Sequence, residues 1–206
     1  MEIIGLTGGY CAGKNEVANI LASHGWDIID VDRLGHEALQ QSAQYIKETF
    51  GTEVFHQDGS IDRKALGAIV FADPARMQQL ESIVHPAMFG LLDSLMDQHL
   101  RKGTEHLCIN AALLYRFPHL RSCSAVIEVK APLLVRISRA RQRDGVSTLQ
   151  ALKRIMAQRA LWRLRPQPPF PIYKVSNYGS LLMLANQVEK VLLALMRSKV
   201  RGKTSF

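Results

Sequence analysis

The segment Gly8–Asn15 combines the residue types that bind phosphate in the spacing GxxxxGK, followed by Asn. Glycines let the backbone wrap closely around an anion, and Lys14 adds a fixed positive charge. An apolar segment, Ile3–Leu6, precedes this loop, and a helical pattern, Glu16–Ala22, follows it, so the helix start offers unpaired N–H groups. This order of strand, glycine loop and helix predicts a phosphate-binding P-loop. The alternative is an ordinary tight turn, which the complete spacing through Lys14 disfavours.

Asn15 occupies the position where a P-loop normally carries a Ser or Thr hydroxyl that binds magnesium. The amide oxygen of Asn15 can also be a ligand, but its side chain is longer than that of Ser. A second possibility is that water takes the vacant place, with Asp30 or Asp32 behind it. Both possibilities predict a metal that is held more loosely.

Asp30 and Asp32 end the second predicted strand, Trp26–Asp32. In a parallel sheet, ligands gather outside the carboxyl ends of the strands, so we expect both carboxylates near the phosphates. A strand that continued through residue 32 would place both on the same side. The alternative for either aspartate is an N-cap of the helix that begins near Arg33.

Arginines account for much of the net charge of +8, and eight of them fall within thirty residues. They are Arg136, Arg139, Arg141, Arg143, Arg154, Arg159, Arg163 and Arg165. Arg139 and Arg143 lie four residues apart and therefore share a helix face. For Arg136, Arg141 and Arg154 we favour a solvated basic face. Nucleic-acid binding would also need aromatic residues among the cations, and only Trp162 lies near them, so nucleic acid is not an expected partner.

The composition, with 47% hydrophobic and 21% charged residues in 206, predicts a compact core with an appended subdomain. No apolar run reaches the roughly 18 residues that a membrane span needs, and no basic leader precedes the first apolar segment, so the expected compartment is the cytoplasm. Three scattered cysteines predict reduced thiols and no zinc site. Within the loop, Cys11 is interpreted as a small residue that fits, rather than as a nucleophile.

Strand and helix patterns alternate along the chain. Strands are predicted at residues 3–6, 26–32, 124–129 and 172–177, and a further strand together with its exit at 107–114. Helices are predicted at 16–22, 33–50, from 63 to 71, from 74 onward, 132–144, 148–165 and 181–199. This alternation predicts a three-layer α/β fold with a parallel five-stranded sheet and helices on both faces. Residues 33–102 form a mostly helical insertion, in which Pro86 is expected to bend its helix.

A set of short motifs occurs along the chain in a particular order and spacing. It comprises Thr7-Gly8-Gly9, Gly13-Lys14, Asp30-Val31-Asp32, Phe50-Gly51, Asp58-Gly59, Asp62-Arg63, Phe71, His85-Pro86, Leu113-Leu114, Arg139, Arg143-Asp144 and Gln158. Together these motifs resemble the dephospho-CoA kinase family, most densely over the first ninety residues and not beyond Arg165. The resemblance implies one P-loop kinase domain over residues 1–206, with an acceptor-binding subdomain at 33–102 and an arginine-rich lid at 132–165.

The resemblance further implies transfer of the ATP γ-phosphate, with Mg²⁺, to the ribose 3′-hydroxyl of dephospho-CoA, the last step of coenzyme A synthesis. Lys14, Asp32 and Arg139 would be the catalytic residues, with Asp32 accepting or orienting the hydroxyl proton. Asp32 and His85 would bind the acceptor, although His85 beside a proline is as often structural, and Asn15 and Asp30 would hold the metal. The implied ATP-binding residues are Gly8, Gly9, Cys11, Ala12, Gly13, Lys14, Asn15, Glu16 and Arg143.

Several positions depart from the family pattern. Ala112 stands for a proline, Asn110 for an aspartate and Arg116 for an acidic residue, and only Asn177 remains of an Asp-Asn-Asn-like stretch. These changes predict weaker organisation of metal or acceptor. They would be explained by a weakly active or non-catalytic nucleotide sensor, and a kinase for another nucleoside-like acceptor is a further alternative. A dephospho-CoA kinase remains the first interpretation. The sequence carries no signal for the oligomeric state.

Overall fold

The structure is a computed structural model that describes residues 1–162 and 169–203. The chain divides into two compact units, one combining Met1–Ile29 with Gly103–Phe206 and the other comprising Asp30–Lys102. Residues 163–165, at the end of the predicted lid, lie outside the described residues, as do Pro166 and Pro168.

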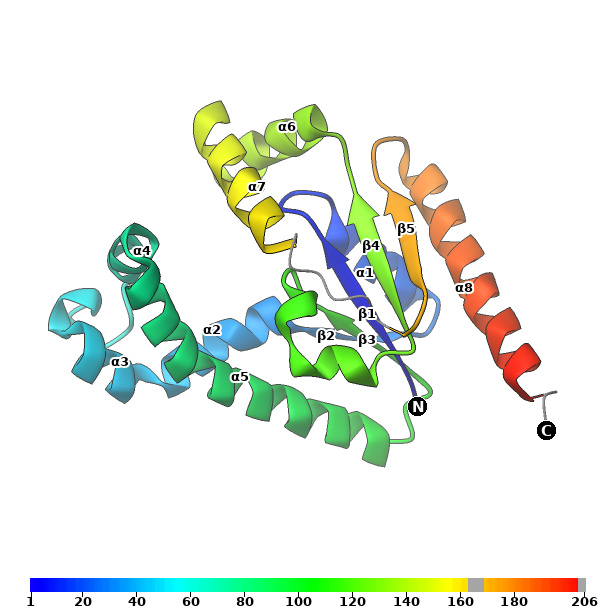
Figure 1. Cartoon of the computed structure of the whole chain (residues 1–206), viewed down its shortest axis with the longest axis horizontal. Helices are drawn as coiled ribbons and strands as arrows, with labels where there is room; N and C mark the ends of the chain where they lie inside the picture. Colours follow the sequence, from blue (N-terminus) through cyan, green and yellow to red (C-terminus); the bar gives the residue numbers. More distant parts are fainter. Residues whose placement is uncertain (163–168, 204–206) are drawn as a thin grey trace. The chain divides into compact units, whose positions relative to one another are not determined.

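A five-stranded sheet forms the centre of the first unit (Figure 1). Its strands are β1 (Glu2–Gly8), β2 (Asp27–Asp30), β3 (His106–Asn110), β4 (Ala125–Lys130) and β5 (Ile172–Ser176), in the order β2-β3-β1-β4-β5. The pairs β1–β3, β1–β4 and β4–β5 are parallel. Because β1 lies in the middle, the loop that follows it opens at the carboxyl ends of its neighbours.

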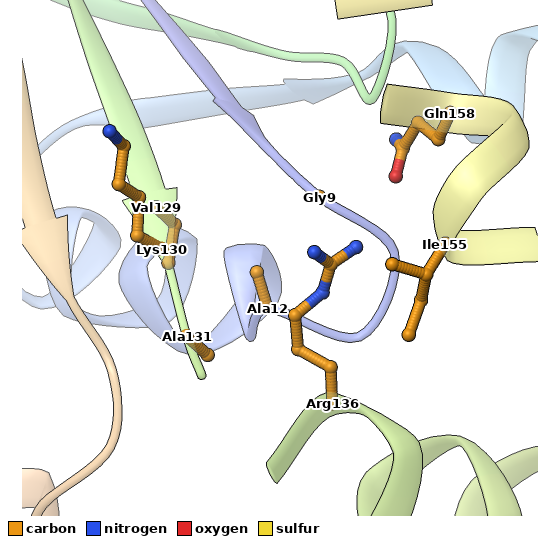
Figure 2. Close-up of a pocket in the computed structure, with 8 residues that line it drawn as sticks. All are labelled: Gly9, Ala12, Val129, Lys130, Ala131, Arg136, Ile155 and Gln158. Atoms are coloured by element: carbon orange, nitrogen blue, oxygen red, sulfur yellow. The ribbon is translucent and has the colours of Figure 1, made fainter. Parts of the chain in front are cut away.

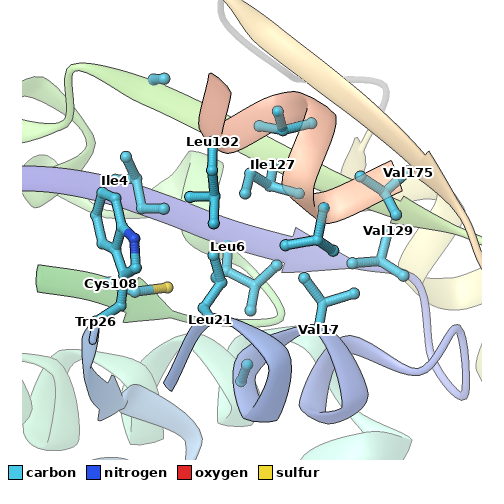
Figure 3. Close-up of a cluster of buried hydrophobic side chains, with 14 of the residues drawn as sticks. Ile4, Leu6, Val17, Leu21, Trp26, Cys108, Ile127, Val129, Val175 and Leu192 are labelled. Carbon is cyan, nitrogen blue, oxygen red and sulfur yellow. The ribbon is translucent and has the colours of Figure 1, made fainter. Parts of the chain in front are cut away.

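Helices α1 (Lys14–Ser23) and α8 (Leu181–Lys203) pack on one face of this sheet. Figure 3 shows Leu21 of α1 and Leu192 of α8 directed toward Leu6 of the central strand. Leu6 and Leu21 are fully buried, and burying such a side chain contributes about 1.5–3 kcal/mol. This cluster fixes α1, and with it the end of the P-loop, against the sheet.

On the opposite face of the sheet, the 3₁₀ helices η2 (Leu114–Arg116) and η3 (Pro118–Ser122) follow β3, and Leu114 and Cys123 lie against Gly5 of β1. There Tyr115 donates a hydrogen bond to Oε1 of Glu128, a β4 residue that is only 1% exposed, at 2.5 Å. The predicted α/β fold, a parallel five-stranded sheet with helices on both faces, is confirmed.

The remaining helices of the first unit, α6 (Leu133–Asp144) and α7 (Thr148–Trp162), form a hairpin. A reciprocal capping box starts α7, since Ser147 N–H donates to Gln150 Oε1 at 2.9 Å and Gln150 N–H donates to Ser147 Oγ at 3.2 Å.

The second unit is helical and contains α2 (Val31–Gln41), α3 (Ala43–Phe50), α4 (Arg63–Ala72) and α5 (Pro74–Arg101). Asp62 and Asp73 cap α4 and α5, because their side chains accept hydrogen bonds from backbone N–H groups of the first turn. α5 runs as one helix of 28 residues that contains Pro86.

Two predicted boundaries in the chain are wrong. The single helix at 33–50 is two helices, which meet at Ser42. The strand at 26–32 ends at Asp30, because the Asp30 side chain caps α2 and the helix takes the following residues. The segment predicted as a strand and its exit, 107–114, divides at Asn110, where β3 ends and the chain turns toward η2.

Candidate active site

The P-loop connects β1 to α1 through two residues with left-handed backbone. These are Cys11, with φ of 56°, and Gly13, with φ of 90°. The turn is closed by a hydrogen bond of 2.8 Å from Ala12 N–H to Gly9 O. A Cβ atom on Gly13 would lie 1.9 Å from Nδ2 of Asn177, so only glycine fits this position. The loop therefore has the compact form that lets backbone N–H groups surround an anion.

Lys14 begins α1, and its ammonium donates to Oδ1 of Asn110 at 2.8 Å. Asn110 is the last residue of β3 and is 2% exposed. The sequence identified Asn110 only as a departure from a family pattern. In the structure it is a direct partner of the predicted phosphate-binding lysine.

Asn177 and Arg139 hold the loop from the side of β5 and α6. Nδ2 of Asn177 donates to Ala12 O at 3.0 Å, and Nη1 of Arg139 donates to the same oxygen at 3.3 Å. Nη2 of Arg139 also donates to Oδ1 of Asn177 at 3.2 Å. Arg139 thus lies at the P-loop, as its predicted role in catalysis requires, and its contact with a transferring phosphate stays a prediction. The predicted site does not include Asn177, although Asn177 is the one residue that remains of the Asp-Asn-Asn-like stretch.

Tyr10, at the tip of the loop, is the main contact with the α6–α7 hairpin. Its hydroxyl donates to Oδ2 of Asp144 and accepts a hydrogen bond of 3.0 Å from Nη1 of Arg154. The guanidinium groups of Arg143 and Arg154 lie 5.4 and 5.7 Å from the centre of its ring. Such cation–π contacts add attraction between the hairpin and the loop. Sequence reasoning gave Tyr10 no role, because nothing local to the loop points to a partner 134 residues away.

Gln158 of α7 contacts the backbone of the same loop. Its Oε1 accepts from Tyr10 N–H, and its Nε2 donates to Gly8 O at 3.5 Å. Arg154 is exposed, as the expected solvated face requires, and it also contacts Tyr10 and Asp144. For Arg136, in contrast, the expectation fails, since its Nε donates to Tyr10 O at 2.7 Å.

The charges around Tyr10 shift the protonation of their neighbours. The pKa of Asp144 is lowered to about 2, chiefly by its hydrogen bonds from Arg143 and then from Tyr10. Burial raises the pKa of Tyr10, and the hydrogen bond with Asp144 raises it further. Burial also raises the pKa of Cys11, so this thiol stays protonated and is a poor nucleophile.

A cavity of about 250 Å³ adjoins the P-loop (Figure 2). It is lined by Gly9 and Ala12 of the loop, by residues 129–131 at the end of β4, and by Arg136, Ile155 and Gln158. Figure 2 shows the guanidinium of Arg136 pointing toward Gly9, whereas the ammonium of Lys130 points away from it. A cation and the backbone of the phosphate-binding loop therefore line the same cavity.

The predicted acidic residues lie in the second unit. Asp30 caps α2 by accepting from Arg33 N–H at 3.3 Å, and Asp32 is exposed in the first helical turn. The expectation that a continuing strand directs both to one side is wrong, because the strand stops at Asp30. His85 is half-buried in α5, with its ring 5.4 Å from that of Phe89.

Asn15 and Glu16 are exposed in the first turn of α1. Among the described residues no group of three or more His, Cys, Asp or Glu side chains could hold a metal ion. Magnesium usually keeps one or two protein ligands and takes the rest from water and substrate phosphates. An amide oxygen at Asn15 fits such a sparse, oxygen-only set. In the part of the chain that the structure describes, no helix is long and apolar enough to cross a bilayer.

The sequence and fold are similar to those of known proteins. The family model for dephospho-CoA kinase matches residues 2–163. A dephospho-CoA kinase from Dehalococcoides mccartyi is 38% identical over 77% of this chain and 81% of its own length. One from Anaeromyxobacter dehalogenans is 34% identical over 98% of this chain and 95% of its own. A crystal structure of a Thermus thermophilus protein superposes with a TM-score of 0.79 at 32% identity, covering 94% of this chain and 96% of that one. With a P-loop, a parallel sheet and matches along nearly its whole length, the chain belongs to the dephospho-CoA kinase family.

Proposed function

We propose that this protein transfers the terminal phosphate of ATP to the ribose 3′-hydroxyl of dephospho-CoA, giving coenzyme A and ADP. The observation that carries the proposal is the P-loop, in which Lys14 is oriented by Asn110 beside a left-handed Gly13. Family membership supplies the acceptor. Phosphoryl transfer needs alignment and positive charge more than covalent chemistry from the protein, and the loop offers both.

In this reaction the oxygen of the acceptor hydroxyl forms a bond to the γ-phosphorus, and the bond to the bridging oxygen of ADP breaks. Loop N–H groups from Gly8 to Glu16 bind the phosphates, and Lys14 neutralises the β and γ groups. Asp32 accepts the proton that leaves the hydroxyl. Its place in the first turn of α2, as an exposed carboxylate, supports a role in proton transfer rather than in packing.

We further propose that Mg²⁺ accompanies ATP and is held by Asn15, with Asp30 as the second predicted ligand. When bound, the ion supplies positive charge to the phosphate oxygens. The amide of Asn15 and the carboxylate of Asp30 would each offer oxygen, the donor that magnesium prefers.

Residues 33–102 are the proposed acceptor-binding subdomain, with His85 as a candidate contact, and residues 132–165 are the proposed lid. Arg143 would bind ATP from the lid, which supports water exclusion during transfer. Contacts from Tyr10 to Asp144 and Arg154 support a lid that responds to the loop. The cytoplasm is the proposed compartment.

A coupled assay with ATP, magnesium and dephospho-CoA tests the proposal. Adenosine and shikimate serve as alternative acceptors, each in a separate parallel reaction. Of the three acceptors, we expect only dephospho-CoA to be phosphorylated. Turnover with another acceptor would indicate a different small-molecule kinase, and ATP binding without any turnover would indicate a nucleotide sensor.

A further inference from the structure

Arg136 is a half-buried arginine whose charge the structure leaves largely uncommitted. Its Nε donates to Tyr10 O at 2.7 Å. Within residues 1–162 and 169–203, its two terminal nitrogens meet no hydrogen-bond acceptor and the side chain forms no ion pair. Burial lowers the pKa of Arg136, which reflects the cost of holding its charge away from water. A nearby anion would offset that cost.

The position of this guanidinium is fixed on two sides. The hydrogen bond to Tyr10 O anchors Nε, and the terminal nitrogens lie against Gly9. A Cβ atom at residue 9 would come within 2.6 Å of Nη2, so the glycine makes room for the guanidinium. Arg136 therefore has a site built for it next to the P-loop, and its terminal nitrogens face the cavity shown in Figure 2.

The cavity has the size and lining for part of a nucleotide. Pockets for whole drug-sized ligands span about 300–1,000 Å³, and this one holds about 250 Å³. A planar guanidinium pairs its parallel N–H groups with two oxygens of a phosphate. Another arginine at the loop, Arg139, already donates to Ala12 O and Asn177.

We infer that Arg136 binds the terminal phosphate of the nucleotide in this cavity and so distinguishes a triphosphate from a diphosphate. The inference rests on the proposed function only in taking ATP as the nucleotide. A terminal phosphate carries more negative charge than the phosphates inside a chain, which makes it the best match for two free N–H pairs. During transfer that charge spreads over three oxygens, where a guanidinium stabilises it.

The test is a comparison of ATP and ADP binding, with magnesium present, by isothermal titration calorimetry on the full chain. For Arg136→Gln we expect ATP affinity to fall about 10- to 100-fold, as for the loss of a hydrogen bond to a charged group, and ADP affinity to change less than about threefold. Arg136→Lys keeps the positive charge but loses the parallel N–H groups, so its ATP affinity should lie between those of the wild type and Arg136→Gln. Arg141→Gln, at an exposed position of the same helix, is the matched control and should leave both affinities unchanged.

Two results would overturn the inference. Equal losses for ATP and ADP in Arg136→Gln would mean that Arg136 only shapes the loop through Tyr10 O. A loss of dephospho-CoA affinity with an unchanged ATP-to-ADP ratio would assign the cavity to the acceptor. Should Arg136→Gln unfold in a thermal melt, the comparison rests on Arg136→Lys, for which an unchanged ratio equally overturns it. Because nucleotide binding is measured without turnover, a wild-type protein that binds ATP but does not phosphorylate dephospho-CoA refutes the proposed function alone.

Discussion

The ammonium of Lys14 and the amide oxygen of Asn110 are 2.8 Å apart, joining the start of α1 to the end of β3. A neutral acceptor orients the lysine without adding an opposing charge. We therefore predict that Asn110 positions Lys14 for phosphate binding.

Asn110→Ala should weaken ATP binding, because Lys14 loses a buried partner that fixes its direction. Hydrogen bonds to charged groups contribute about 1.5–3 kcal/mol, so we expect a loss of about 10-fold or more. Calorimetric titration with ATP measures it. Asn19→Ala, an exposed asparagine of α1, is the control and should bind ATP normally. Unchanged affinity in Asn110→Ala would show that the loop alone orients Lys14.

Lys14→Ala should abolish ATP binding or turnover, because water cannot replace a phosphate-binding cation in a closed site. Equilibrium binding and the coupled kinase assay both report the change. The exposed Lys153 of α7 provides a matched control in Lys153→Ala. Wild-type affinity and rate in the Lys14 variant would rule out the P-loop interpretation.

Asp32→Asn should cut turnover by about 10²- to 10⁴-fold, the usual contribution of a positioned proton acceptor. The amide keeps the shape of the side chain and loses its basicity, so ATP affinity should stay near that of the wild type. Steady-state rates with dephospho-CoA, together with ATP titrations, separate the two effects. If turnover is undiminished, Asp32 serves only the start of α2.

Asn15→Thr should lower the magnesium concentration needed for half-maximal activity. A hydroxyl is a more compact ligand than an amide for an ion that demands short contacts. The thermal stability should change little, since residue 15 is exposed in the first turn of α1. Magnesium titrations at saturating ATP compare the two proteins, and magnesium-dependent ATP affinity gives a second reading. An equal or higher requirement in the variant would indicate a site built around the amide.

Asp144 should make stability fall in acid. Its pKa is lowered from 3.8 to about 2 in the folded protein, so its contribution is complete above about pH 4 and disappears as the pH falls toward 2. Denaturant unfolding between these two pH values should therefore show that the free energy of unfolding falls more steeply with decreasing pH for the wild type than for Asp144→Asn. Asp97→Asn, at an exposed position of α5, should behave like the wild type. Parallel curves for wild type and Asp144→Asn would contradict the shift.

Features that depend on neighbours along the chain could be predicted from residue types and spacing. Gly13 and Lys14 end the loop that follows an apolar strand, and Asp62 and Asp73 cap the helices that begin one residue later. Turn geometry, caps and the strand-to-helix order are local, so residue types and spacing suffice to predict them. The same local signal was ambiguous at Asp30 and Asp32, since a strand end and a helix cap accept the same residues.

Contacts between side chains that are distant in sequence could not be predicted from residue types and spacing. Lys14 and Asn110 are 96 residues apart, and Tyr10 meets Arg136 at a separation of 126 residues. These contacts arise because strands β1, β3 and β4 lie next to one another, which brings their carboxyl ends, and the segments that follow them, to one place. Burial is a further property that residue spacing does not specify. The sequence suggested that Arg136 belongs to a solvated basic face, whereas in the fold it lines a cavity beside Gly9.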